Sequence, residues 1–381
     1  ARHWQRRGAR FESDTLHFLK EQCPTELLFF DSLLEVIILY KSEPSYLIIM
    51  ERKLIIRNFG AIASADIALK DFNIFIGEQG AGKSTVAKLI TIFENSRDKV
   101  LKVDSDYLMT KFSEYNIISY FNPDSYISYS SEQGDITYED GSFNFTFSYH
   151  STSHNLYIPA ERFFISTFSR SIATLVLSKA PIPVTLLEFA SFYEKAKNLF
   201  VNYQAPIFNI IFQVREASEN LVLSNYDKII PFKDASSGIQ SVVPLLMVID
   251  YITKEQPDTH FVIEEPELNL FPETQIALLQ HIVKECHQLT ITTHSPYLLS
   301  ALNNMLEAGN VSKLHPEKEE EIAALMPKSS WVDFNKITAY KIEKGHIISI
   351  LDKEYNIIVA DQIDSTSDEQ GRIFSSLLDL E

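Results

Sequence analysis

The sequence predicts an α/β fold with a largely parallel central sheet, and three observations support this prediction. Short apolar runs typical of strands alternate with segments whose apolar residues recur every three or four positions, as in amphipathic helices. A glycine-rich turn at residues 77–85 joins one such strand to a helix, and two glutamates follow another strand at residues 264–265. Strands that alternate with helices in this way favour a largely parallel sheet.

The first elements are three strand-like runs, KLIIRNF, SADIAL and FNIFIG, which lie between residues 53 and 77. A helix is expected from Lys83 to Asn95. Residues 136–149 are expected to form a hairpin, because Asp140-Gly141 is a dipeptide favoured in two-residue hairpin turns. From about residue 183 to residue 222 the apolar spacing is more typical of helices.

The C-terminal half continues the alternation of helices and strands. The expected elements are a helix at Gly238–Thr253, a strand at 260–264, a helix at Glu273–Cys286, a strand at Leu289–Thr293 and a further helix. Residues 339–351, AYKIEKGHIISIL, are expected to form a hairpin appended to the sheet. The predicted architecture is therefore a mixed, mainly parallel sheet with an antiparallel β subdomain and a helical insert.

The pattern suggests three parts: an extension at residues 1–49, a core domain at 50–310 with an insert at about 96–235, and an appendage at 311–381. The extension is basic at its start, and the first methionine of the chain is Met50. We interpret the extension as a tail or as translated sequence upstream of the real start, with a nucleic-acid-binding arm as the alternative. Prolines are frequent in the insert, and each interior proline costs ~3 kcal/mol of helix, so we expect a compact subdomain rather than a long coiled coil.

Composition limits the possible functions. A net charge of −17 disfavours a surface made for non-specific DNA binding, because phosphate contacts need a local basic excess, although a local basic groove stays possible. The two cysteines, Cys23 and Cys286, cannot form a disulfide framework, which suits the cytoplasm. No apolar run reaches the ~20 residues of a membrane-spanning helix, so no membrane association is expected.

Residues 77–85 read GEQGAGKST and match the phosphate-binding P-loop pattern G-x-x-x-x-G-K-[ST]. Glycine lets the backbone fold around the β-phosphate with its N–H groups pointing inward. Lys83 supplies positive charge to the β- and γ-phosphates, and the Ser84 hydroxyl can ligate Mg²⁺. The motif therefore predicts ATP and Mg²⁺ as cofactors, bound by Gly77, Glu78, Gln79, Gly80, Ala81, Gly82, Lys83, Ser84 and Thr85.

Three further side chains at strand ends are expected to complete the site, because functional groups of parallel sheets gather at the carboxyl ends of strands. Glu264 can hold Mg²⁺ or its water shell, and Glu265 can orient and deprotonate the water that attacks the terminal phosphate. His294 ends the next strand and could hydrogen-bond the γ-phosphate or that water. Glu265, His294 and Lys83 are therefore the predicted catalytic residues; solvated acids and a structural histidine are the alternatives.

The segment Ser236-Ser237-Gly238-Ile239-Gln240 precedes a predicted helix. Small hydroxyl residues and glycine at a helix N-terminus form an anion site, although simple capping is an alternative. The order of the motifs favours the anion site. A P-loop, then SSGIQ, then a strand with paired glutamates, then a strand ending in histidine resembles the ABC ATPase superfamily.

In that resemblance SSGIQ is similar to the signature motif, EEP to Walker B, ELNLFP to the D-loop region and His294 to the switch histidine. IEEPELNLFP and TTHSPYLLSAL are similar to RecF-, SMC- and OLD-type AAA-family ATPases rather than to transporter subunits. YIPAERF at 157–163 is also similar to that group, but Arg162 receives no role. The sequence departs from the usual motifs at Ser236, at Ile239 and at Glu264, where aspartate is commoner.

The resemblance implies a P-loop ATPase of ABC type that acts as an ATP-dependent homodimer. Ser237 and Gly238 would contact the γ-phosphate bound by the P-loop of the other copy, so ATP would join two head-to-tail copies and hydrolysis would release them. Relatives of this kind serve DNA repair, chromosome handling and phage defence. A separate effector protein, such as a nuclease, and DNA are possible partners.

Other functions give different expectations. A RecF-like clamp that uses ATP to bind DNA is the main alternative, and stimulation of hydrolysis by DNA would favour it. A transporter ATPase subunit is a third hypothesis. It is disfavoured because the sequence shows no confident Q-loop glutamine and because the region after EEP is unusual. A GTPase fits less well, because FNKIT at 334–338 lacks the aspartate of the guanine-binding N-K-x-D motif.

Overall fold

The computed structural model describes residues 52–97, 103–147, 154–168, 171–215, 218–223, 228–359 and 372–377. The predicted N-terminal extension, residues 1–49, lies outside these ranges. Among the described residues, no helix has both the length and the apolar character needed to cross a bilayer.

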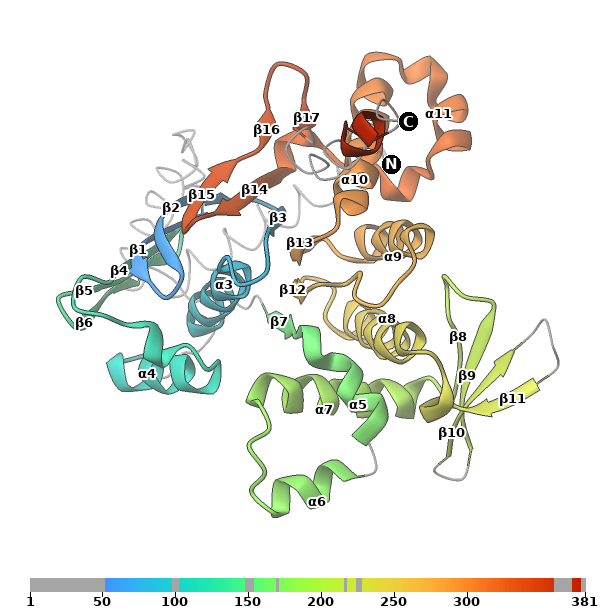
Figure 1. The fold of residues 1–381 in the computed structure, drawn as a ribbon, viewed down its shortest axis with the longest axis horizontal. Helices are drawn as coiled ribbons and strands as arrows, with labels where there is room; N and C mark the ends of the chain where they lie inside the picture. The colour runs from blue at the N-terminus through green and yellow to red at the C-terminus, as the bar shows by residue number, and fades with distance from the viewer. Residues whose placement is uncertain are drawn as a thin grey trace, which may run out of the picture. The chain divides into compact units, whose positions relative to one another are not determined.

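One eleven-stranded sheet dominates the structure, with the order β6-β5-β4-β1-β2-β15-β14-β3-β13-β12-β7 (Figure 1). The half from β14 to β7 is parallel, and the half from β6 to β2 is antiparallel. This confirms the predicted mixed sheet. The strands are β1 (Arg52–Phe59), β2 (Ile62–Leu69), β3 (Phe72–Gly77), β4 (Tyr126–Ser131), β5 (Gly134–Glu139), β6 (Ser142–Phe147), β7 (Asn155–Ile158), β12 (His260–Glu264), β13 (Gln288–Thr293), β14 (Ile337–Glu343) and β15 (His346–Ser349).

Helices cover both faces of the parallel half. Figure 1 shows α3 (Lys83–Arg97) on one face and α8 (Ser237–Glu255), α9 (Pro272–Glu285) and α10 (Pro296–Leu314) on the other. Successive side chains of β3 explain this, because Phe75 packs into the core under α3 while Ile74 and Ile76 pack into the core of α8–α10. Strands buried on both faces need the continuous apolar runs that the sequence shows.

The insert contains α4 (Ser105–Glu114), α5 (Phe163–Phe168), α6 (Ile172–Leu177), α7 (Val184–Leu199) and a four-stranded antiparallel sheet. The expected helical pattern up to residue 222 is wrong after Leu199, because the chain then forms β8 (Asn202–Gln204), β9 (Ile210–Arg215) and β10 (Ser218–Leu223), which β11 (Lys228–Pro231) completes. The alternating side chains Ile210 and Phe212 are buried in the same core as Tyr193 of α7. Burial of one face of this small sheet against the helix outweighs the weak local helical spacing.

The expected hairpins both form, but the second has a different place. Asp140 and Gly141 turn between β5 and β6 with φ values of 50° and 79°. The C-terminal hairpin β14–β15 is not appended to the sheet: β14 pairs in parallel with β3, and β15 reaches β2. It therefore joins the parallel and antiparallel halves. The remaining C-terminal elements include the acidic helix α11 (Glu319–Leu325) and the short pair β16 (Leu351–Asp352) and β17 (Ile357–Ile358).

Candidate functional site

Three parallel strands end at the same edge of the sheet. Glu264 of β12 lies opposite Thr292 of β13, and Thr292 lies opposite Phe75 of β3. The segments that follow these strands therefore leave the sheet side by side. They are the P-loop, the paired glutamates and His294, which the sequence predicted to meet.

The P-loop connects β3 to α3. Its residues Glu78, Gln79 and Gly80 are exposed, so the outer side of the loop is open to a ligand. Gly80 and Gly82 have φ values of 76° and 108°, which side chains with a Cβ rarely adopt. The first turn of α3 contains Lys83, Ser84 and Thr85, and its free N–H groups and helix dipole favour an anion at this end.

Lys83 joins the P-loop to His294. Its Nζ donates to the carbonyl oxygens of Gly77 and Glu78, both at 3.0 Å, and lies 3.0 Å from Nε2 of His294. Burial lowers the pKa of Lys83, and the carboxylates of Glu265, Glu267 and Glu264 oppose that shift. The ammonium therefore sits among acceptors that phosphate oxygens could replace.

His294 also contacts Glu265, since its Nε2 lies 2.8 Å from Oε1 of that carboxylate. Nε2 of His294 accepts a hydrogen bond from Lys83 in one tautomer and donates one to Glu265 in the other, but it cannot do both at once. Both side chains are partly exposed, at 34% for His294 and 25% for Glu265, so water and ligand can reach them. The three side chains predicted to be catalytic therefore form one connected group.

Glu264 is suited to hold a metal ion. Its side chain is buried, and its Oε1 has no hydrogen-bond partner within the described part of the chain. Burial raises the pKa of this carboxyl, while the hydroxyls of Ser84 and Tyr157 and the charge of Lys88 oppose the shift. A buried acceptor without a donor is unfavourable unless a ligand completes it.

Oxygen donors of this kind fit Mg²⁺, which is usually bound by one or two protein oxygens together with substrate phosphates and water. Ser84 supplies a hydroxyl and Glu264 a carboxylate oxygen. In the described ranges, no group of three or more His, Cys, Asp or Glu side chains is arranged to hold a metal. The pair Ser84 and Glu264 is therefore the candidate Mg²⁺ site.

Sequence reasoning gave no role to two buried side chains of the site. Arg162, between β7 and α5, donates to the main-chain oxygens of Glu264 and Glu265, both at 2.7 Å. Glu267 accepts hydrogen bonds from Thr293 Oγ1 at 2.5 Å and from the backbone N–H of His294 at 2.9 Å. Glu267 lies two residues after Glu265, and this closeness in the sequence could have indicated that it belongs to the site. Arg162 gave no such signal, because its partners are main-chain atoms.

The signature-like residues do not join this group. Ser236 and Ser237 are exposed at the start of α8, and no hydrogen bond among the described residues links Ser237 or Gly238 to the P-loop of the same chain. A Cβ on Gly238 would lie 2.6 Å from the main-chain oxygen of Asn269. Glycine therefore lets α8 begin in close contact with the turn that follows the glutamates.

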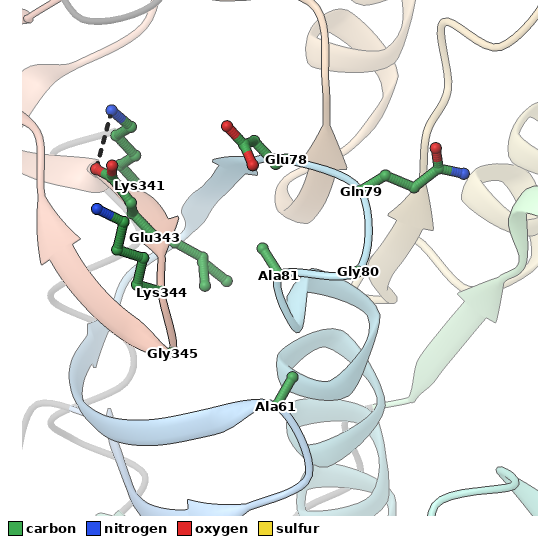
Figure 2. A pocket seen from close by; sticks show the side chains of 10 residues that line it. Ala61, Glu78, Gln79, Gly80, Ala81, Lys341, Glu343, Lys344 and Gly345 are labelled. Atoms are coloured by element: carbon green, nitrogen blue, oxygen red, sulfur yellow. Dashed lines mark ion pairs between the residues drawn. The ribbon is translucent and has the colours of Figure 1, made fainter.

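A cavity of about 300 Å³ lies beside the P-loop. Figure 2 shows Glu78, Gly80 and Ala81 of the loop on one side and residues 341–345 of the β14–β15 hairpin on the other. Lys341 and Glu343 form an ion pair of 3.2 Å in its wall. The hairpin reaches this place because Ile342 pairs with Gly77, the last residue of β3.

A family model described as the AAA ATPase domain matches residues 50–173 and 187–299, which is well over half of the chain. A search of the curated proteins finds no match.

Several solved structures show a distant likeness. The SMC head domain from Thermotoga maritima is 11% identical, with a TM-score of 0.39, over 79% of this chain and 98% of that chain. The recombination mediator protein RecF is 11% identical, with a TM-score of 0.40, over 79% and 98%. An ATP-binding cassette of an ABC transporter in its ADP conformation is 13% identical, with a TM-score of 0.37, over 83% and 97%.

Proposed function

This chain belongs to the AAA ATPase domain family, and from that premise we propose that it hydrolyses ATP and acts as a switch that closes into a nucleotide-bridged homodimer. The observation that supports this most is the connected group of Lys83, His294 and Glu265 at the carboxyl edge of the sheet. A cation for the phosphates, a carboxylate for water and a histidine between them are the groups that phosphoryl transfer to water needs.

In the proposed reaction, N–H groups of the P-loop and of the first turn of α3 bind the β- and γ-phosphates. Lys83 exchanges its carbonyl partners for phosphate oxygens. Ser84 and Glu264 would hold Mg²⁺, which neutralises phosphate charge when bound. Glu265 orients the attacking water and takes its proton, and His294 hydrogen-bonds the γ-phosphate or that water.

We propose that the nucleoside of ATP binds in the cavity beside the P-loop, because the cavity is lined by Gly80 and Ala81 of that loop. Ala61 lines this cavity on the side of the β1–β2 turn and is exposed. Ala61→Trp should fill the space and weaken ATP binding while leaving the fold intact. Unchanged affinity for ATP would place the nucleoside elsewhere.

The exposed start of α8 supports the dimer. The helix N-terminus at Ser236 and Ser237 is exposed. Among the described residues, it makes no hydrogen bond to the P-loop of the same chain. A second copy could supply the triphosphate that this anion site would bind. ATP would then lie between the P-loop of one copy and the Ser237 region of the other.

The test is the size of the protein with Mg·ATP, measured by chromatography with light scattering. Glu265→Gln should accumulate a dimer, because it binds ATP but cannot hydrolyse it, and Lys83→Ala should stay monomeric. Glu273→Gln, the same change at an exposed position of α9, is the matched control and should behave as wild type. Monomeric Glu265→Gln with bound ATP would contradict the bridged dimer.

The biological output of the switch is proposed from the motif resemblance, which points to DNA repair or defence against phage through a partner effector. The RecF-like clamp differs from this proposal in one measurable way. ATPase rates with and without duplex DNA separate them: stimulation by DNA supports the clamp, and indifference supports a switch read by a protein partner.

A further inference from the structure

We propose that Arg162 is a positioning residue for Glu265, acting by holding the main chain of the turn Glu264–Pro266 rather than by touching substrate. The inference rests on the proposed function, because it concerns the same carboxylate. It gives a role to a side chain that neither the motifs nor the family match explains.

The guanidinium of Arg162 is enclosed by main-chain oxygens. Nη1 donates to Glu264 at 2.7 Å and to Pro159 at 3.2 Å, and Nη2 donates to Glu265 at 2.7 Å and to Pro266 at 3.2 Å. The residue is 0% exposed. Burial lowers its pKa to about 10, with nearby glutamates opposing the shift, so the group stays charged at neutral pH.

Arginine suits this position for a geometric reason. Its N–H donors lie in one plane and point in fixed directions, so a single side chain can bond oxygens on several consecutive residues. A lysine in the same place carries its donors on one nitrogen and cannot span them. The position therefore needs the planar guanidinium of arginine, and the positive charge of a lysine is not enough.

The turn that Arg162 holds is strained. Glu265 has φ of 41°, in the left-handed region that non-glycine residues rarely occupy, and its N–H donates to the oxygen of Thr292 at 2.9 Å. Such a conformation costs ~1–3 kcal/mol and persists only where surrounding contacts impose it. In this conformation the carboxylate of Glu265 reaches Nε2 of His294 at 2.8 Å. Without the hydrogen bonds from Arg162, the turn would relax and the carboxylate of Glu265 would move away from His294.

The segment that carries Arg162 is itself attached to α8. Oγ of Ser166, on α5, donates to the main-chain oxygen of Phe163 at 2.7 Å and lies 3.3 Å from Oε1 of Gln240. The amide of Gln240 donates to the oxygens of Lys233 and Ala235, both at 2.8 Å, in the loop that leads to Ser236. Arg162 itself donates to the turn Glu264–Pro266 and to Pro159, while the helix that follows it contacts the residue that bonds the loop before Ser236.

The experiment compares Arg162→Lys and Arg162→Gln with wild type in steady-state ATPase kinetics and thermal melting. Misplacing a catalytic group by ~1 Å can lower the rate by ~10²-fold, so kcat should fall about ten- to a hundredfold while KM for ATP stays within about twofold. Lysine should not rescue glutamine, since it cannot span the oxygens. In a Glu265→Gln background, Arg162→Lys should lower the residual rate no further.

Arg52→Lys is the matched control, because Arg52 also donates to a main-chain oxygen, that of Lys70 at 2.6 Å, and pairs with the buried Glu94. It should lower the melting temperature but leave kcat of the folded protein near wild type. The proposal is overturned if Arg162→Lys folds and its kcat is unchanged, whether or not kcat/KM falls through a higher KM. Failure of both Arg162 variants to fold also overturns it, since the residue would then serve folding. An inactive wild type would instead refute the proposed function itself.

Discussion

The two ends of strand β12 place buried carboxylates in opposite situations. At the start, His260 Nδ1 lies 2.5 Å from Oε2 of Glu94, whose Oε1 accepts from Arg52 and Tyr129 at 3.0 Å each. At the end, Oε1 of the equally buried Glu264 has no hydrogen-bond partner within the described residues. The side chains are of the same type and similarly buried, and they differ in their partners.

This difference distinguishes a carboxylate that stabilises the fold from one that is suited to bind a ligand. A buried carboxylate with several donors stabilises the fold. If a donor is removed, the desolvation penalty of the carboxylate is no longer offset and the fold is destabilised. A buried carboxylate with one oxygen that lacks a donor destabilises the nucleotide-free protein and is retained where a ligand supplies the missing contact. The start of β12 is therefore interpreted as a structural network, and its end as a site for a ligand.

The largest expected effect is on catalysis at the end of β12. Glu265→Gln should lower kcat about 10²–10⁴-fold, the range for loss of a general base. The unfolding free energy should change little, because this side chain is partly exposed. Phosphate release and urea unfolding measure the two quantities. If the lower rate of Glu265→Gln came from a lower unfolding free energy, the two ends of β12 would not differ in role.

The next effect is on stability at the start of β12. Glu94→Gln should lower the unfolding free energy by about 3–5 kcal/mol, because it breaks a buried ionic network. At a temperature where the variant is folded, its kcat should stay near wild type, since Glu94 belongs to the opposite end of the strands. Urea unfolding and ATPase rates check this. A rate loss as large as that of Glu265→Gln would show that the two ends are not separable.

A smaller effect of opposite sign is expected for Glu264→Gln. Without nucleotide the variant should be about 1–2 kcal/mol more stable than wild type, because the change removes a buried charge whose Oε1 has no donor among the described residues. With Mg·ATP, the ligand-dependent rise in melting temperature should largely disappear. Destabilisation of the nucleotide-free variant would mean that Glu264 is a structural carboxylate like Glu94.

The smallest effect is a pH dependence. Burial raises the pKa of Glu264, so the folded protein binds this proton more tightly than the unfolded chain does. The penalty of the buried charge is present above the raised pKa and is lost as pH falls through it. The stability gap between wild type and Glu264→Gln should therefore narrow on acidification, and Mg²⁺ affinity should fall over the same range. A gap independent of pH would contradict this.

The sequence predicted the parts of the site that are local. The P-loop and the glutamates after β12 are read from a few adjacent residues, because strand, turn and helix follow directly in the chain. The meeting of Glu265, Lys83 and His294 also followed, since parallel strands bring their carboxyl ends to one edge.

What the sequence did not predict depends on distant contacts. The pairing of β14 with β3 joins residues more than two hundred positions apart, and an alternating hairpin looks the same at an edge as in the middle of a sheet. The role of Arg162 was missed because carbonyl oxygens exist at every residue. Strands β9 and β10 were missed because burial against α7, not local spacing, determines them.

The central claim is that the group at the end of β12 cleaves ATP. The most direct test is phosphate release from Mg·ATP by purified wild type and by Lys83→Ala. We expect steady turnover by wild type and no turnover above background by the variant. Equal phosphate release by both proteins, or none by wild type, would contradict the account.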